Sequence, residues 1–387
     1  PEVQEKCLEI LRNGMRSDEF WPAIHAAEGL TLAGHGDEVR SYLAPKLHTE
    51  TDDQKLCGLS RELVRAGDWQ RSSVMLAILE KPDSYGHTHA CESLYKVFEL
   101  GDGTGLRRVW QSSSDSKTKL MAAAALARGG NPHAMSFLRA ELASSDEETR
   151  KIAAWILARI GSSKDISQLQ KNLKLNTDPM TIAYTEHALA LLGDPDGLAA
   201  LKKNLSSTDP AIRTYAATFA GEVRDFSTAD ALIRLLADEN LDTRIRAAQS
   251  LAMFSQPAPA DVYADIENLV YPATAKNPRY TEGSIVRLRN GHLLYAATEF
   301  IEGGSDFAKA HIVARESSDL GRSWSDSRVL QESTGDMNVM SVTLRRLNAP
   351  HNDTIVMFYL EKNSHTDLRV YVRLSNDEAK SFGDRVL

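Results

Sequence analysis

Cysteines and histidines are the side chains most able to hold a metal or form a disulfide in the helical part of the chain, up to residue 255. Cys7, Cys57 and Cys91 are odd in number, form no C-x-x-C pair and lie beside apolar neighbours. This is the pattern of small buried hydrophobic residues. Only His87 and His89 stand close together, with no acid or cysteine at ligand spacing. We expect no metal, no cofactor and no catalytic group in this part of the chain.

Two motifs near the other end have the residue types of a specific turn. Residues 317–324 read Ser-Ser-Asp-Leu-Gly-Arg-Ser-Trp, and residues 375–382 read Ser-Asn-Asp-Glu-Ala-Lys-Ser-Phe. Serine and aspartate side chains can accept hydrogen bonds from the amides of such a turn, and glycine supplies a positive φ. The second copy has Ala379 where glycine is expected, which predicts a strained or altered turn. The expected structural residues are Ser317, Asp319, Gly321, Trp324, Ser375, Asp377 and Phe382.

A strand pattern surrounds these motifs. Asn290-Gly291 lies between two apolar runs, which is a strong hairpin signal. Further strands are predicted at 311–316, 339–346, 354–361 and 368–374, with no helix between them. The motifs begin at Ser317 and Ser375, and the interval between them is close to the length of one propeller blade.

The first part of the chain has a helical repeat. Alanine-rich segments end at Gly129, Gly161 and Gly193, which are equally spaced along the chain, and an amphipathic stretch follows each glycine. Such two-helix units bury their apolar faces by stacking into a solenoid. The pattern resembles HEAT-like repeats. This resemblance implies that Arg150, Arg213 and Arg244, which fall at matching places, tie neighbouring repeats together.

Composition and length set the remaining limits. A chain of 387 residues is too long for one ordinary core, so we expect a multidomain α plus β protein. The predicted parts are an α-solenoid of HEAT-like helical pairs at 1–255, a linker at 256–276 and antiparallel β blades at 277–387. The net charge of −8 argues against nucleic-acid binding. No apolar run reaches the roughly 18 residues of a membrane span. The abrupt start and end lead us to expect that the chain is a piece of a longer protein.

The β part resembles bacterial sialidases. The resemblance rests on Arg279, on the hairpin sequence 287–294 and on strand 311–316, which leads directly into the first motif. That motif matches the Asp-box (BNR repeat) of these enzymes. The resemblance covers about residues 275–387 and implies an incomplete six-bladed β-propeller, with only the first two blades present.

The same resemblance implies roles for individual residues. Sialidases bind the sugar carboxylate with three arginines, and a planar carboxylate suits guanidinium groups. Arg279 lies where the first of these arginines is found, although Tyr280-Thr281 replaces the usual Ile-Pro after it. Asp306 falls where the acid/base aspartate is found, and Glu282 and Asn338 are candidate substrate contacts. The nucleophilic tyrosine, its glutamate and the other arginines should lie beyond Leu387, so we expect this chain to be inactive.

The leading hypothesis is an exo-α-sialidase-like glycoside hydrolase that releases terminal sialic acid, with an enzymatic parent protein. Two alternatives stay open: a non-catalytic Asp-box propeller that binds glycans, and a HEAT-repeat scaffold that binds a protein on its concave face. The expected partners are therefore sialylated or related glycans, or a protein. An extracytoplasmic location is favoured by analogy alone.

Overall fold

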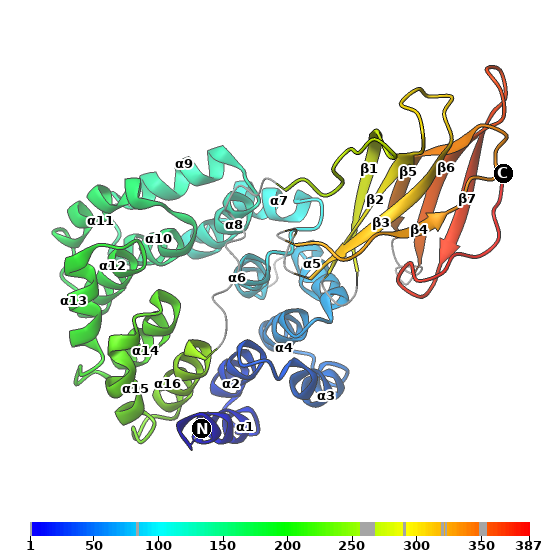
Figure 1. Cartoon of the computed structure of the whole chain (residues 1–387). Coiled ribbons are helices and arrows are strands. Elements are labelled where there is room, and N and C mark those ends of the chain that lie inside the picture. Colours follow the sequence, from blue (N-terminus) through cyan, green and yellow to red (C-terminus); the bar gives the residue numbers. More distant parts are fainter. Residues whose placement is uncertain are drawn as a thin grey trace. The chain divides into compact units, whose positions relative to one another are not determined.

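The computed structural model describes residues 2–82, 85–255, 268–288, 292–318, 321, 323–347 and 354–387. The chain divides into two compact units, Pro1–Ala258 and Pro259–Leu387. A helical repeat region is followed by antiparallel β-sheets, and each unit has a hydrophobic core of its own (Figure 1).

The helical unit is a series of antiparallel pairs, as the repeat pattern predicts. Its helices are α1 (Glu2–Met15), α2 (Phe20–Leu32), α3 (Gly36–Leu47), α4 (Asp53–Arg65), α5 (Ser72–Glu80), α6 (His87–Val97), α7 (Thr104–Ser112), α8 (Ser116–Arg128), α9 (Pro132–Glu141), α10 (Glu147–Ile160), α11 (Ile166–Leu173), α12 (Pro179–Leu191), α13 (Pro195–Asn204), α14 (Pro210–Val223), α15 (Ala229–Leu235) and α16 (Leu241–Phe254).

Aspartate caps begin several of the even-numbered helices. Asp146 accepts hydrogen bonds from the backbone N and Oγ1 of Thr149, at 2.8 and 2.7 Å, at the start of α10. Asp178 does the same for Thr181 at the start of α12, where Pro179 occupies the first turn. Such caps satisfy amides that have no partner within the helix, so the local sequence sets where these helices begin.

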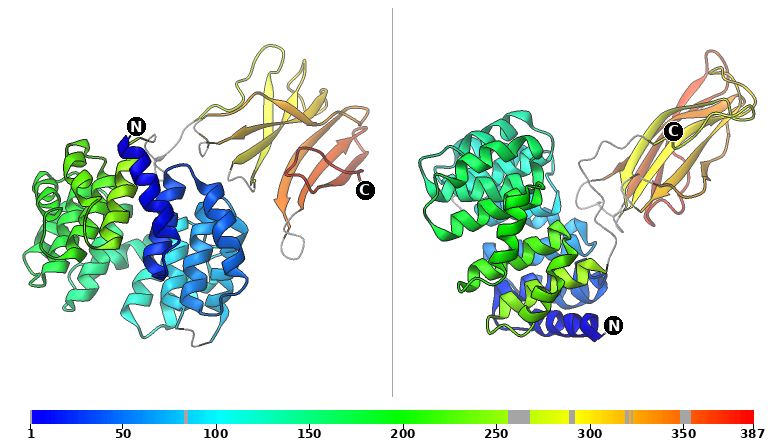
Figure 2. Two further views of the ribbon diagram at one scale, coloured as in Figure 1. Left: turned by 90° about the horizontal axis from the view of Figure 1, so that it is seen from below. Right: turned by 60° about the vertical axis from the view of Figure 1, so that its left-hand side comes forward.

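The even-numbered helices form the inner layer, and the series closes on itself. Each packs against the next even-numbered helix, and α1 and α2 pack against α16 (Figures 1 and 2). Glycines permit the close approach: a Cβ at Gly14 would lie 2.9 Å from Cδ1 of Ile245, and one at Gly29 would lie 3.2 Å from Cβ of Gln249. The helical pairs expected to form a solenoid with a concave face therefore form a ring, in which the first pair covers the last helix.

Two of the three matching arginines join neighbouring repeats. Arg150 donates from Nε to Oδ1 of Asn176 at 2.8 Å, and Arg213 donates from Nε to Oδ2 of Asp238 at 2.9 Å. Arg244 instead donates to the carbonyl oxygen of Asp238, in the loop before its own helix, at 2.6 Å. Arg150 and Arg213 therefore link repeats, whereas the hydrogen bonds of Arg244 stabilise a loop.

The β unit contains two open antiparallel sheets. One has the order β1-β2-β3-β4 and the other β5-β6-β7, and their facing sides form a shared core. The sequence pattern predicted each strand except β4. The strands are β1 (Arg279–Arg287), β2 (Leu293–Phe300), β3 (Ala310–Ser317), β4 (Arg328–Gln331), β5 (Asn338–Arg346), β6 (Ile355–Lys362) and β7 (Leu368–Ser375).

The second sheet repeats the first in register. Arg279 pairs with Phe300 at the start of β1, and Asn338 pairs with Lys362 at the start of β5. An irregularity interrupts both strands at the matching place, between Thr281 and Ser284 and between Met340 and Thr343.

The match extends to the fourth strand. Ala314 pairs with Arg328 of β4, and Val372 forms an isolated bridge with Val386. The number of residues from Ala314 to Val372, and from Arg328 to Val386, equals the number from the start of the first motif to the start of the second. The two sheets are therefore copies of one structural unit.

Both motifs form turns after equivalent strands. Oγ of Ser317 accepts the amide of Gly321 at 2.8 Å, and Oγ of Ser375 accepts the amide of Ala379 at 2.9 Å. Gly321 has a φ of 91°, and Ala379 adopts a φ of 59°, so the second turn keeps the positive φ without glycine. Asp377 accepts from the amide of Ser381 at 2.9 Å.

Some predicted features lie outside the described residues, and others differ in the structure. Asp319, the turn Asn290-Gly291 and positions 256–267 of the expected linker lie outside the described residues. Tyr271, also in the expected linker, stacks on Tyr280 of β1 at 4.8 Å between ring centroids and so belongs to the β unit. No closed sheet is present among the described residues, so a propeller is not established.

Candidate functional sites

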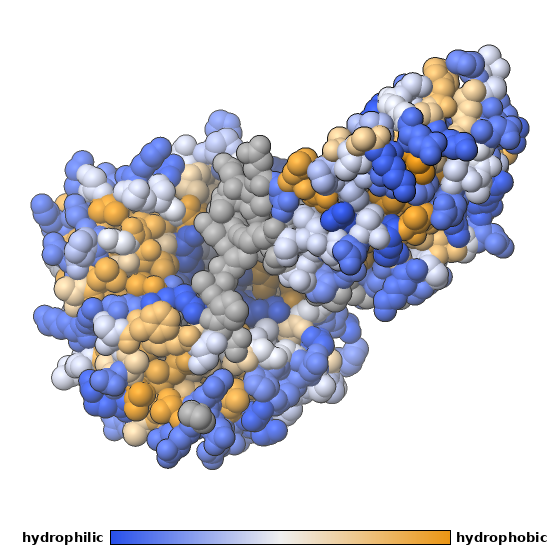
Figure 3. Space-filling model, in the orientation of Figure 1, coloured by the Kyte–Doolittle hydropathy of each residue, from blue (hydrophilic) through white to orange (hydrophobic). Residues whose placement is uncertain are grey.

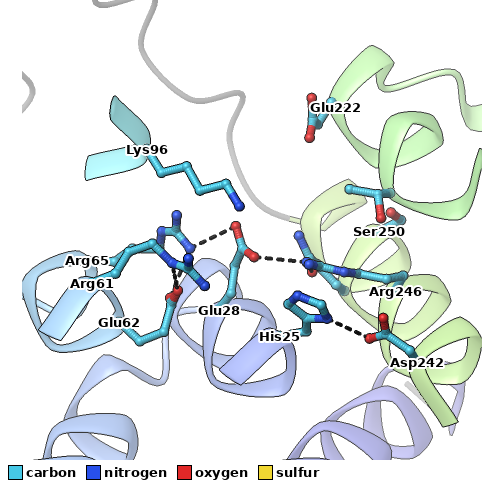
Figure 4. Close-up of polar contacts among 12 residues, drawn as sticks. His25, Glu28, Arg61, Glu62, Arg65, Lys96, Glu222, Asp242, Arg246 and Ser250 are labelled. Carbon is cyan, nitrogen blue, oxygen red and sulfur yellow. Dashed lines mark hydrogen bonds and ion pairs between the residues drawn. The ribbon is translucent and has the colours of Figure 1, made fainter. Parts of the chain in front are cut away.

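Charged side chains from several inner helices meet at the centre of the ring (Figure 4). Glu28 of α2 forms ion pairs with Arg65 of α4 at 2.7 Å and with Arg246 of α16 at 2.8 Å. Glu62, which is fully buried, accepts Nε of Arg61 at 2.7 Å and Nη1 of Arg65 at 2.9 Å. Glu28 therefore connects helices on both sides of α2, including the seam where the ring closes.

Three more pairs complete this central charge cluster, each at 2.7 Å. They are Lys96 with Glu92, Arg159 with Glu222, and His25 with Asp242. The pair between Arg159 and Glu222 connects α10 to α14 and so skips α12. On the side of the helical unit seen in Figure 3, a hydrophilic band interrupts the hydrophobic surface.

Aromatic rings make cation–π contacts with Arg159 and Lys96 of the central charge cluster. The guanidinium of Arg159 lies 4.5 Å from the ring centroid of Trp155 and 4.6 Å from that of Phe219. Nζ of Lys96 lies 5.4 Å from the centroid of Trp155. Tyr95 of α6 contacts Trp155 of α10, with centroids 5.7 Å apart. Such contacts stabilise buried cations and connect helices across the ring.

Nearby cations lower the pKa values of Glu28 and Glu92 in the central charge cluster. Burial raises the pKa of Glu28, but Arg65 and Arg246 outweigh it and hold that pKa well below the usual value. For Glu92, Lys96 and Arg61 outweigh burial and lower the pKa to about 2. Burial and the nearby Arg246 lower the pKa of His25, although Asp242 opposes the shift.

This arrangement is self-neutralising. Each acid of the central charge cluster has a cationic or imidazole partner within hydrogen-bonding distance, which is what buried charges require. The contacts therefore connect helices and stabilise the closed ring. The cluster was not predicted from the sequence, although one signal was present: Arg65 and Arg159 each stand two residues before the glycine of a repeat.

A second group lies where β1 and β5 begin. Nη1 of Arg279 donates to Oδ1 of Asp306 at 2.6 Å and to the carbonyl oxygen of Gly304 at 3.0 Å. Asn338 donates through Nδ2 to the carbonyl oxygens of Asp306 and Ala308, at 3.0 and 2.8 Å. Three of the four predicted contact residues are thus brought together, and we call Arg279, Asp306 and Asn338 the strand-end cluster.

The strand-end cluster differs in exposure from residue to residue. Asn338 is fully buried and positions the loop, whereas the side chain of Asp306 is 54% exposed and that of Arg279 is 33% exposed. Glu282 lies apart, at the irregularity of β1, where its Oε2 accepts the hydroxyl of Ser341 at 2.8 Å. The arrangement offers one guanidinium and one carboxylate to solvent, already paired with each other.

The described residues contain no group of three or more histidine, cysteine or acidic side chains able to hold a metal ion. Among those same residues, no helix has both the length and the apolar character needed to cross a membrane.

Comparisons with known proteins bear on the helical unit. A family described as HEAT repeats matches residues 104–190 and 176–252. A solved structure of human deoxyhypusine hydroxylase in complex with glycerol is similar at 15% identity and a TM-score of 0.35, over 65% of this chain and 96% of that one. Among curated proteins, none matches this chain. The N-terminal part of the chain therefore contains HEAT-like repeats.

Proposed function

We propose that the protein is a HEAT-repeat scaffold that binds another protein. HEAT-like repeats support a role in protein interaction. Because charged side chains fill the centre of the ring, a partner would bind to another part of its surface. A concave-face site would need open inner helices, whereas here Glu28, Arg159 and Glu222 already contact residues of other inner helices. The partner surface is then a rim of the ring.

One observation carries this proposal: the C-terminal ends of two inner helices hold exposed or charged residues in a conformation that favours glycine. Phe98 ends α6 with a φ of 57°, and Arg224 ends α14 with a φ of 57°. Phe98 is 42% exposed, and Phe226, two residues after Arg224, is 59% exposed. A non-glycine residue there costs about 1 kcal/mol, and such strain accumulates at functional sites.

The chemistry of these rim residues suits protein recognition. Arg128 lies over the ring of Phe98 at 5.4 Å, and Arg224 lies over that of Phe226 at 5.9 Å. Aromatic residues and arginine are enriched among the residues that dominate binding energy at protein interfaces.

The test compares capture of proteins from a lysate of the producing organism by the wild type and by Phe98→Gly with Phe226→Ser. We expect one specific partner to lose at least tenfold in capture, while Phe98→Gly keeps or raises the melting temperature. Tyr85→Ala, at another exposed aromatic residue of the helical unit, is the matched control. Equal capture by the rim variant would contradict the proposal.

A second candidate function is recognition of an anionic sugar by the strand-end cluster. Its support is the pairing of Arg279 with Asp306 beside Asn338, at the start of two sheets whose third strands lead into the serine–aspartate turns. A guanidinium of this kind suits a sugar carboxylate. Hydrolysis of a sialoside, as in an exo-α-sialidase, would need a nucleophile in addition to Asp306.

The assay for this second function is calorimetric titration with 3′-sialyllactose, with lactose as the uncharged control. We expect Arg279→Ala to abolish binding and Arg369→Ala, an exposed arginine of β7 paired with Asp367, to leave it unchanged. No measurable binding by the wild type would remove this function.

A further inference from the structure

Two turns, one from each sheet, meet beside the strand-end cluster. Phe307 lies in the turn between β2 and β3, and His365 lies in the turn between β6 and β7. Their ring centroids are 4.1 Å apart. Nζ of Lys362, at the end of β6, lies 4.0 Å from the centroid of Phe307. We call Phe307, Lys362 and His365 the tip cluster.

Hydrogen bonds fix the first of these turns around Phe307. The buried Asn338 donates to the carbonyl oxygens of Asp306 and Ala308, on either side of Phe307. The amide of Phe307 donates to Oγ of Ser305 at 3.1 Å. The side chain of Phe307 is nevertheless exposed, at 44%. Because the turn is already ordered, a ligand that contacts this ring would lose little affinity to ordering of the chain.

The second turn is fixed in the same way. Oγ of Ser364 accepts the amides of Thr366 and Asp367, at 3.1 and 2.9 Å. His365, between these residues, is exposed. Both rings of the tip cluster are therefore presented to solvent by ordered backbone.

The tip cluster adjoins the strand-end cluster and offers different chemistry. Phe307 directly follows Asp306, so their Cα atoms lie about 3.8 Å apart. The strand-end cluster presents a guanidinium and a carboxylate, whereas the tip cluster presents two rings and the nitrogens of an amine and an imidazole. A pyranose has apolar C–H groups as well as hydroxyl groups, and rings with polar groups beside them can contact both.

We propose that the tip cluster is a second subsite, which binds the sugar next to the anionic unit of an oligosaccharide held by the strand-end cluster. The proposal rests on the second candidate function, recognition of an anionic sugar. Phe307 and His365 contact the apolar side of the second sugar, and Lys362 donates to its hydroxyl groups. The ligand is therefore an oligosaccharide of at least two sugars, and a single anionic sugar fills only half of the site.

The test is calorimetric titration of the full chain with two ligands, the methyl α-glycoside of sialic acid and 3′-sialyllactose. The first has no second sugar, so only 3′-sialyllactose can contact the tip cluster. The wild type should bind 3′-sialyllactose more tightly, by roughly tenfold or more. Phe307→Ala should bring the two affinities to within about twofold of each other. Lys362→Met is a second variant that reduces the ratio, in case loss of the ring perturbs the first turn.

The matched control is Phe358→Ala, at a phenylalanine of β6 that is 38% exposed and lies outside the tip cluster. It should keep the wild-type ratio of the two affinities. Binding of neither ligand by the wild type would overturn this proposal together with the second candidate function. Equal affinities in the wild type would overturn the second subsite alone, and so would a ratio that both Phe307→Ala and Lys362→Met preserve.

Discussion

Replacing Glu28 with glutamine removes the charge that connects three inner helices. The side chain is 16% exposed and is paired with Arg65 and Arg246, which are 15% and 10% exposed. The substitution leaves both guanidinium groups without their shared carboxylate, and breaking one partner of a buried pair costs about 3–5 kcal/mol. Because some solvent reaches these groups, we expect the lower end, about 3 kcal/mol. For a unit of this size that lowers the melting temperature by roughly 6–12 °C.

The measurement is thermal unfolding of the full chain, followed by circular dichroism at the helical band. The matched control is Glu80→Gln, which breaks an ion pair with Arg108 whose partners are 62% and 46% exposed. Exposed pairs contribute less than about 1 kcal/mol, so this control should shift the melting temperature by no more than roughly 4 °C. Equal melting temperatures for the two variants would refute the claim that the central charge cluster stabilises the ring.

Three further predictions follow from the same geometry. The pKa values of Glu28 and Glu92 are lowered in the folded state, which favours folding above about pH 4.5. Urea titrations should therefore show that the free energy of unfolding falls as the pH drops toward about 2. Glu92→Gln should make this dependence on pH less steep. The folded-state pKa of His25 is below its usual 6.5, so the free energy of unfolding should also fall as the pH drops through about 6.5. Urea titrations at pH 7.5 and 5.5 should show that His25→Gln removes this loss of stability. The same loss in the variant would exclude His25 as its source. Gly321→Ala, at a φ of 91°, should cost about 1 kcal/mol in calorimetry, whereas Ala379→Gly should change stability by less than about 0.5 kcal/mol, because relief at a φ of 59° is offset by loss of a buried methyl group.

Local patterns predicted the elements well. The spacing of Gly129, Gly161 and Gly193 and the caps such as Asp178 are short-range signals, and they identified the helical pairs. Strand alternation predicted β5, β6 and β7 to within one residue at either end. The brief strand β4 was missed, because so short a segment has no clear period.

Long-range features were not accessible in the same way. The seam between α2 and α16 joins residues from opposite ends of the helical unit, such as Glu28 and Arg246, and no local period encodes that distance. The pairing of Arg279 with Asp306 likewise depends on the loop that Asn338 positions. The two motif turns were foreseen, and the strain expected where Ala379 replaces glycine takes the form of a positive φ of 59°.

Closure of the HEAT-like repeats into a ring is the claim on which the account rests, and a disulfide across the seam tests it most directly. In a background with Cys7, Cys57 and Cys91 replaced by alanine, Gly29→Cys and Gln249→Cys would place two Cβ atoms about 3.2 Å apart, within a few tenths of an ångström of disulfide geometry. We predict that mild oxidation links residues 29 and 249 within one chain, detected as a cross-linked peptide by mass spectrometry, with single-cysteine variants as controls. Absence of that intramolecular link in folded protein would contradict the closed ring, because α2 and α16 would then lie apart as in an open solenoid.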